Sequence, residues 1–518
     1  MTQFAPDRFG MFAKRIVYFT LALISGQALL LGVPLRPVLA GQKLNHAATQ
    51  KDKFAKKQEG TLPSSGSSLA SAAESYYLLK PVLGPGHGAV IEVDLEVGGD
   101  LLVQEGADLN YEEGETPSPG PVEKKLPLRV VAKLRYQEHL LAWSTKAATR
   151  SIRYYDTAQA TIKVGQEGLK RTLADTHRLI LTEVRDSRVV MNGLHAPLTR
   201  AQEDLLQVVG DTLVLDRLLP GQRLAKGESW THDAQTIGAL LGMDHVALCE
   251  VSSVVTGEDN GQVRLRLAGS VHGTIDGAAT ELELRGAYLF DRAQERISRF
   301  NLAIKEHRKT GPVSPGLDVV AKLKLKVHPK EPLTHLDEKV IAETEKLDGP
   351  ISHELLYDSP QHGFRFRYDD HWYITAEGRD RLALRLLHNS TLVAHCNVST
   401  LTARAAGRQT TLVQFEREIR QTLGDRLDDV KAAKEWTTAT GHHCLGIIVN
   451  GKIKDVPLQW RYYLIAADGM PRISLLVTVE RAQIKNFADA DRHLVESLKL
   501  TGQSAQTTAA RPAKTPAR

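Results

Sequence analysis

QVRLRLAGSV (residues 262–271) and TELELRGAYLF (residues 280–290) are the part of the sequence on which the fold depends. In the first segment Val263, Leu265 and Leu267 alternate with arginines, and the second alternates leucines with glutamates in the same way. Successive side chains of a strand point to opposite faces, so each segment predicts a strand with one apolar and one charged face. Long strands of this kind predict an antiparallel sheet that meets solvent on one side.

The same alternation extends outward from this pair of segments in both directions. It recurs in AVIEVDLEV (89–97), LPLRVVAKLRY (126–136), ALCEVSSVVT (247–256), ISRFNLAIKEHR (297–308) and LDVVAKLKLKV (317–327). We therefore expect residues 76–330 to form a β-rich domain of long antiparallel strands, a curved sheet or half-barrel, interrupted by an acidic loop at 104–126. A capping box that begins at Thr199 and a second cap at Asp233 predict short helices to cover its apolar face.

Two segments of this domain carry a resemblance. LLPGQRLAKGESW (218–230) and GAYLFDRAQERISRFNLAI (286–304) resemble a group of uncharacterised bacterial exported proteins. More loosely, the pattern is similar to the lipoprotein carriers of the LolA and LppX type, in which a curved sheet wraps helices around a cavity for acyl chains. That resemblance implies a carrier of an apolar, lipid-like ligand, and a filled core is the alternative reading.

Residues 352–500 predict a second domain. GFRFRYDDHWYI (363–374) opens it with alternating aromatics, and TTLVQFEREIRQTLG (410–424) is a helix capped at Thr411 and ended by Gly424. The domain resembles the PsbP-like family, on these packing positions: Phe364, Phe366, Tyr368, Trp372, Phe487, Leu494, Ser497 and Leu498. The resemblance implies an α/β/α sandwich around an antiparallel sheet, so the expected class for the whole chain is α+β. Members of that family act mostly through assembly or binding.

The first forty residues read as a signal peptide. Lys14 and Arg15 precede an apolar run at 16–33, and Val38-Leu39-Ala40 is a small-residue cleavage pattern before Gly41. We therefore expect an exported chain, periplasmic or extracellular, with an uncleaved signal anchor as the alternative. No integral membrane segment is expected after removal of the signal.

Three further segments have the composition of connecting chain. Residues 41–75 predict a disordered linker, residues 331–351 a linker with a short helix, and residues 501–518 a disordered tail. The formal net charge is +5, and four basic residues against one acidic residue in segment 1–40 account for +3 of it. The rest of the chain is close to neutral and shows no concentrated basic face, which argues against a nucleic-acid partner.

Cysteines and histidines were weighed as candidates for chemistry. Cys396 and Cys444 lie on expected strands and form a disulfide if those strands meet, with two buried thiols as the alternative; Cys249 reads as a small core residue. His395 beside Cys396, and residues 442–444 (His-His-Cys), contain zinc-ligand types. Neighbouring residues of a strand face opposite ways, so we expect no metal site at either place.

No short catalytic motif is present, and Asp369-Asp370-His371 reads as a turn rather than an acid–base group. We expect no catalytic residue and no cofactor. The sequence therefore favours a non-catalytic binding or assembly protein of the cell envelope, whose partner is an envelope protein or an apolar ligand. A hydrolase with a site assembled from distant residues is the less favoured alternative. The sequence predicts no oligomeric state for the chain.

Overall fold

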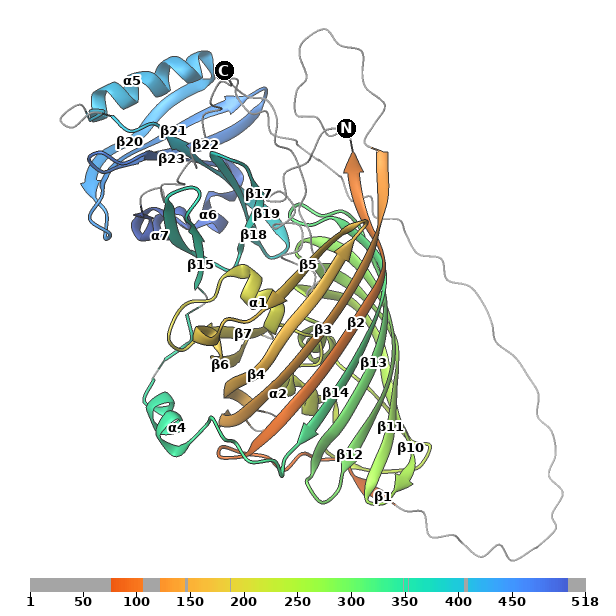
Figure 1. Cartoon of the computed structure of the whole chain (residues 1–518). Helices are drawn as coiled ribbons and strands as arrows, with labels where there is room; N and C mark the ends of the chain where they lie inside the picture. The colour runs from red at the N-terminus through yellow and green to blue at the C-terminus, as the bar shows by residue number, and fades with distance from the viewer. Residues whose placement is uncertain are drawn as a thin grey trace, which may run out of the picture.

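The computed structural model describes residues 76–105, 122–144, 148–186, 188–347, 349–352, 354–404 and 409–501. Of these residues, 58% lie in strands and 16% in helices, so the protein is predominantly β and the expected α+β class is wrong. The expected signal peptide with its cleavage site at Ala40 and Gly41, the linker 41–75, segment 106–121 of the acidic loop and nearly all of the tail lie outside the described residues. Figure 1 shows the chain from end to end.

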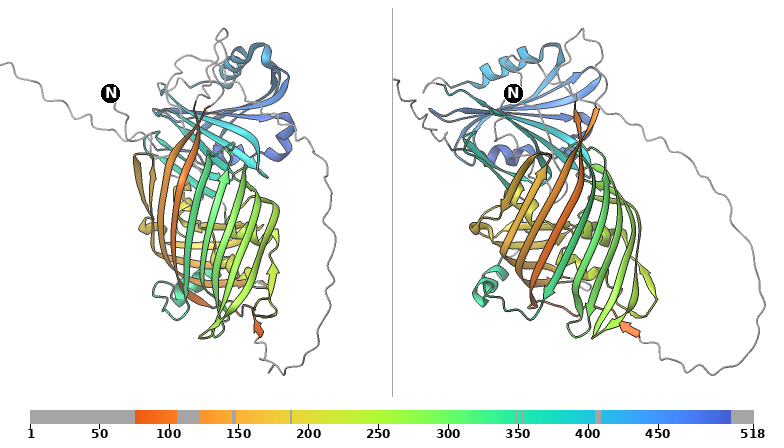
Figure 2. Two further views of the ribbon diagram at one scale, coloured as in Figure 1. Left: turned by 90° about the vertical axis from the view of Figure 1, so that its right-hand side faces the viewer. Right: turned by 45° about the vertical axis from the view of Figure 1, so that its right-hand side comes forward.

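One twelve-stranded antiparallel sheet dominates the N-terminal domain. Its strand order is β7-β6-β4-β3-β2-β14-β13-β12-β11-β10-β9, and β5 pairs with β4 beside this path. The strands are β2 (Gly88–Glu105), β3 (Val122–Trp143), β4 (Ala148–Val164), β5 (Glu167–Thr172), β6 (Leu179–Arg185), β7 (Arg188–Gly193), β9 (Ser229–Thr231), β10 (His245–Asp259), β11 (Gln262–Ile275), β12 (Ala278–Asp291), β13 (Arg296–Arg308) and β14 (Gly316–His328). Figure 2 shows how strongly this sheet twists and curves.

The two faces of the large sheet differ as the alternation predicts. Leu323 and Leu325 of β14 are buried, whereas Lys324 between them is exposed. On the charged face, Lys322, Lys324 and Lys326 stand opposite Glu96, Asp94 and Glu92 of β2. Opposite charges on neighbouring strands attract each other, so this pairing favours the observed register. The same charged side chains form the face that meets solvent.

Short helices cover the apolar face. They are α1 (Arg200–Leu206), α2 (Thr212–Leu215) and α3 (Ala234–Leu241), together with the 3₁₀ turn η3 (Asp216–Leu218); the other 3₁₀ turn, η2 (Asp175–His177), has no buried residue. Thr199 and Gln202 form the expected capping box of α1, and Asp233 caps α3 through the backbone N–H of Thr236. Helices α1 and α2 contact β4, and α3 contacts β10. A separate two-stranded sheet pairs β1 (Tyr76–Leu78) with β8 (Arg223–Ala225).

The C-terminal domain contains two smaller antiparallel sheets. One has the order β15-β16-β24 and the other the order β17-β18-β19-β23-β22-β21-β20. The strands are β15 (Glu354–Ser359), β16 (Phe364–Asp369), β17 (Trp372–Glu377), β18 (Arg381–His388), β19 (Thr391–Leu401), β20 (Leu427–Thr437), β21 (His443–Ile453), β22 (Val456–Ala466), β23 (Arg472–Glu480) and β24 (Lys499–Leu500).

Helices are few and short in this domain, which is the physical reason that the expected sandwich class fails. They are α5 (Leu412–Leu423), α6 (Ile484–Phe487) and α7 (Asp491–Ser497), with the 3₁₀ turns η4 (Gly424–Arg426) and η5 (Arg481–Gln483). The apolar pattern after Gln483 predicts one closing helix, but Ala488 and Asp489 adopt left-handed backbone angles (φ 45° and 59°) and divide it in two. Between the domains, the segment 331–351 contains α4 (Glu338–Glu345).

The two domains share their interior. One continuous cluster of buried apolar side chains runs from the large sheet into the C-terminal domain, where it includes Leu355 and Trp372. The backbone N–H of Leu356 on β15 donates to the carbonyl of Leu198, at 2.8 Å, across the boundary. In both views of Figure 2 the C-terminal domain sits over one end of the long strands. Among the described residues, no helix has the length and apolar character needed to cross a membrane.

Candidate functional site

A pocket of about 290 Å³ lies in the C-terminal domain, close to the domain boundary. Strands β15 and β16, the turn after β16, the end of β18 and helices α6 and α7 contribute to its wall. The wall combines three imidazoles and two carboxylates with apolar groups, and its residues are Glu354, Asp369, His371, Leu386, Leu387, His388, Asn486, Phe487, Ala490 and His493.

Strand pairing and helix packing position one side of this pocket. Glu354 stands directly opposite Asp369 in the β15–β16 register, so two carboxylates occupy neighbouring positions on one sheet. The Ser497 hydroxyl of α7 accepts from the backbone N–H of Arg367 (2.9 Å) and donates to its carbonyl (3.0 Å). These bonds fix α7 against β16 and place His493 Nε2 3.1 Å from Glu354 Oε1. We name this contact the Glu354–His493 pair.

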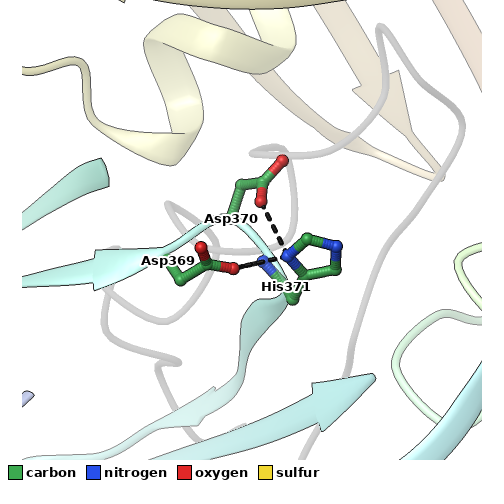
Figure 3. Close-up of side chains that lie close together, drawn as sticks. All are labelled: Asp369, Asp370 and His371. Atoms are coloured by element: carbon green, nitrogen blue, oxygen red, sulfur yellow. Dashed lines mark hydrogen bonds and ion pairs between the residues drawn. The ribbon is translucent and has the colours of Figure 1, made fainter. Parts of the chain in front are cut away.

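The turn Asp369-Asp370-His371 forms the other side (Figure 3). His371 Nδ1 lies 2.5 Å from Asp369 Oδ1 and 3.0 Å from Asp370 Oδ1. Hydrogen bonds to Asp369 and Asp370 raise the pKa of His371 to about 10, against the opposing effect of burial. The ring is therefore an imidazolium at neutral pH. We name the contact between Asp369 and His371 the Asp369–His371 pair.

Two arginines of the N-terminal domain contact this turn. Arg200 of α1 donates to the carbonyls of Asp370 and, at 3.2 Å, of Trp372, and its guanidinium lies 5.1 Å from the ring centroid of Tyr373. Arg188 of β7 lies 3.8 Å from Asp370 Oδ2, and its Nη1 is 3.5 Å from His371 Nε2. The orientation of the turn thus depends on how the domains dock.

The hairpin between β18 and β19 makes a second junction. Its tip residue Ser390 shares a hydrogen bond of 2.7 Å with Thr274 of β11. Beside it, Leu387 packs with Val313 and Tyr373 in a small buried apolar cluster that joins the domains. His388, which follows Leu387, therefore reaches the pocket from an anchored strand end.

Of the two readings of Cys396 and Cys444, the structure has the two buried thiols. Cys396 and Cys444 are buried free thiols on β19 and β21. Strands β23 and β22 lie between these two strands, which puts them roughly 14 Å apart at about 4.8 Å per strand spacing. A disulfide requires the two Cα atoms to lie within about 7 Å, so the possible bridge is absent because the sheet order separates the strands. Cys249 is also free and half-buried.

The histidines beside these cysteines serve other contacts. Burial lowers the pKa of His395 to about 4. His442 accepts from the backbone N–H of Leu500 at 3.1 Å, and His443 Nε2 lies 2.9 Å from Glu435 Oε1. Within the described part of the chain, the group of three or more His, Cys, Asp or Glu side chains that lie close enough to hold one ion is the Asp369-Asp370-His371 turn.

Two further polar clusters lie inside the N-terminal domain. His232 Nε2 and the Tyr288 hydroxyl each hydrogen-bond the buried Ser253 hydroxyl at 2.8 Å, and burial lowers the pKa of His232 to about 4. Arg153, which is 1% exposed, donates to Glu138 at 2.8 Å and twice to Asp211 at 2.7 Å. Both clusters are enclosed by core side chains and fix the packing of helices on the sheet.

Sequence reasoning placed Asp369-Asp370-His371 in a turn, where the structure has it, but gave it no role. It missed Glu354, His388 and His493, which complete the pocket. These residues come from segments far apart in the chain, and no local spacing connects them. His493 falls within the expected closing helix, whereas Glu354 and His388 fall outside the elements that the sequence predicts, so no signal in the sequence could have joined them.

Comparisons with known proteins do not identify a family for this chain. No family model matches the chain, and no curated protein matches it. Among solved structures, a protein of Bacteroides thetaiotaomicron VPI-5482 is 12% identical over 28% of this chain and 47% of its own, with a TM-score of 0.22. A Pseudomonas aeruginosa protein of unknown function is 15% identical over 31% of this chain and 100% of its own, with a TM-score of 0.17. This chain spans about half of the Bacteroides chain, and scores this low carry no argument.

Proposed function

We propose that the chain is a non-catalytic, exported binding protein that holds a small positively charged ligand in the pocket beside the domain boundary. One observation carries the proposal: two imidazole–carboxylate pairs, Glu354–His493 and Asp369–His371, line the same pocket. Glu354 and Asp369 lie on neighbouring strands of one sheet, so a cation in the pocket is attracted by two negative charges.

The lining supports binding rather than catalysis. The pocket residues include no hydroxyl or thiol that could act as a nucleophile. His371 is held as an imidazolium by its two carboxylates, so it is not available as a general base near neutral pH. The pocket is a recess lined by charged and apolar side chains, which is typical of a binding site.

The carrier alternative lacks comparable support. Helices α1, α2 and α3 occupy the apolar side of the large sheet, and Leu206, Val214 and Ile237 on them are at most 1% exposed. An acyl chain could enter only if these helices moved out of the core, which would expose their apolar side chains to water.

The test is a thermal-shift screen of the purified protein against small cations, which include spermidine, lysine, arginine and divalent metal ions. We expect at least one cation to raise the melting temperature in a saturable way. The double variant Glu354→Gln/Asp369→Asn should lose that response. Glu435→Gln, which alters an imidazole–carboxylate pair outside the pocket, should keep it. A protein that no cation stabilises, or a response that the double variant retains, contradicts the proposal.

Export is tested separately by fractionating cells that produce the full chain. We expect the protein outside the cytosol. Recovery of the chain from the cytosol with residues 1–40 intact would contradict this part of the proposal.

A further inference from the structure

We propose that the outer face of strands β11 to β14 binds a linear polymer that carries phosphate groups along its chain. This surface belongs to the large sheet of the N-terminal domain, whereas the pocket lies in the C-terminal domain, so the two sites are independent of each other. Three observations support the proposal: the charges that the strand register brings together, the lack of carboxylates among them, and the kinds of side chain that lie between them.

Three successive rows of outward-facing side chains cross these four strands. Through register partners on β12 and β13, the rows run from Ala268 to Lys322, from Arg266 to Lys324 and from Arg264 to Lys326. Three positions on each of four strands make twelve, and all of them are exposed or half-buried. Register partners point to the same side of a sheet, so the twelve side chains form one surface, which we name the basic face. In Figure 1 the four strands lie side by side, with the short helices on the other side of the sheet.

The basic face has a strongly one-sided charge. Seven of its twelve side chains are basic and none is acidic. The basic residues are Arg264, Arg266, Arg285, Arg299, Lys322, Lys324 and Lys326. Arg299 and Lys326 stand directly opposite each other, and like charges in that position do not stabilise strand pairing. Along the sequence these residues alternate with apolar ones, so the concentration of positive charge arises only in the assembled sheet.

Carboxylates pair with the border of the basic face but not with its middle. Lys326 lies 3.7 Å from Glu92 of β2, and Arg264 lies 4.0 Å from Asp259 of β10. In the part of the chain that the structure describes, no ion pair is formed by the other five basic residues, which are Arg266, Arg285, Arg299, Lys322 and Lys324. These five side chains are therefore available to an anion from solution.

The nearest carboxylates have partners of their own. Asp94 of β2 is the register partner of Lys324, but its carboxylate pairs with Lys133 of β3 at 3.6 Å. Glu283 of β12, which lies just beyond the basic face, is 3.1 Å from Lys305 of β13. The positive charge in the middle of the face is thus not cancelled by these neighbours, and it attracts a negatively charged partner.

The side chains between the charges select the class of partner. They are Ala268, Ala287, Leu289, Asn301 and Ala303. None of the twelve side chains is aromatic, so the face has no platform on which the bases of a single-stranded nucleic acid could stack. The one large apolar side chain, Leu289, is half-buried, so the face has no exposed apolar group to insert into a bilayer. An anionic polymer without bases fits both observations.

The basic side chains suit phosphate groups that repeat along a chain. A guanidinium donates two parallel N–H bonds to one phosphate, and an ammonium binds phosphate as a point charge. Rows lie about 6.8 Å apart along a strand and strands about 4.8 Å apart, so the face measures roughly 14 Å in each direction. Each row contains at least two basic side chains and can contact one phosphate, which gives about three contacts for a polymer that crosses the face.

The experiment is isothermal titration calorimetry of the purified protein with sodium polyphosphate at several NaCl concentrations. We expect the affinity to fall roughly tenfold between about 50 and 200 mM NaCl, because about three phosphate contacts release counterions. The triple variant Arg266→Gln/Arg285→Gln/Lys324→Gln removes one basic side chain from each row. It should weaken binding at least about tenfold and reduce the salt dependence.

The matched control is Arg417→Gln/Lys434→Gln/Lys452→Gln. It also removes three positive charges, but from exposed positions of the C-terminal domain, and it should leave the affinity within about twofold of the original. Circular dichroism and the melting temperature, unchanged in both triple variants, establish that they fold.

Several results would overturn the inference. They are polyphosphate binding that the Arg266/Arg285/Lys324 variant retains, binding that the control weakens equally, and no binding at the lowest salt concentration. Parallel titrations use a single-stranded oligonucleotide, polygalacturonate and phosphatidylglycerol vesicles. Tighter binding to any of these than to polyphosphate also overturns it, because bases, carboxylates or a bilayer would then be what the face recognises.

Discussion

Replacing Arg200 by methionine should cost about 3 kcal/mol of folding free energy, the lower end of the roughly 3–5 kcal/mol typical when one member of a buried ion pair is removed. The side chain is 15% exposed, and its partner Glu203, at 2.7 Å, is 5% exposed. The substitution leaves that carboxylate in a low-dielectric environment and removes the donor to the carbonyls of Asp370 and Trp372. Methionine has a helix propensity similar to that of arginine and keeps most of its apolar stem. The loss of folding free energy therefore measures the polar contacts of Arg200.

The assay is equilibrium urea denaturation at pH 7, followed by tryptophan fluorescence. Arg417→Met on α5 is the matched control, because the same substitution at an exposed helical site should change the free energy of unfolding by less than about 0.5 kcal/mol. Since Arg200 anchors the turn, Arg200→Met should also weaken the cation response in the thermal-shift screen, whereas Arg417→Met should not. A loss below about 1 kcal/mol in the Arg200 variant would refute the reasoning that the substitution leaves a buried carboxylate and two carbonyls without their donor.

Three further predictions concern buried groups. Burial lowers the pKa of His232 and of His395 to about 4, below the ordinary value near 6.5. Their contribution to the free energy of unfolding is therefore complete above pH 6.5 and is lost as the pH falls toward 4. Urea denaturation should show this fall in the free energy of unfolding, of which His232 accounts for at most about 3 kcal/mol. The His232→Gln variant should lose that part of the pH dependence, and an unchanged pH slope would count against the prediction. Cys396 and Cys444 should react with a thiol reagent only after unfolding, and a reducing agent should leave the melting temperature unchanged; a mass two daltons below that of the fully reduced chain would show a bridge instead. Arg153→Met should destabilise the protein by about 3–5 kcal/mol in urea because it leaves two buried carboxylates unpaired, and a near-neutral result would contradict this.

Local pattern explains which parts of the fold were predictable. The period-two alternation in segments such as 262–271 requires only that neighbouring side chains point to opposite faces, so the long strands and the charged outer face follow from it. The caps at Thr199, Asp233 and Thr411 are equally local, because each side chain bonds a backbone N–H three residues away. The expected helical sandwich failed where Ala488 adopts a left-handed conformation, since apolar spacing does not report a break that packing imposes.

The sequence by itself thus determined strand character, the two faces of the large sheet and the helix caps, because these depend on residues within a few positions of one another. Only the tertiary structure decided the strand order that separates Cys396 from Cys444, and the pocket that brings Glu354 and His493 to the turn before Trp372. Both depend on contacts between residues far apart in the chain. Such contacts arise from burying a shared apolar core, and no spacing along the sequence records which distant segments that core brings together.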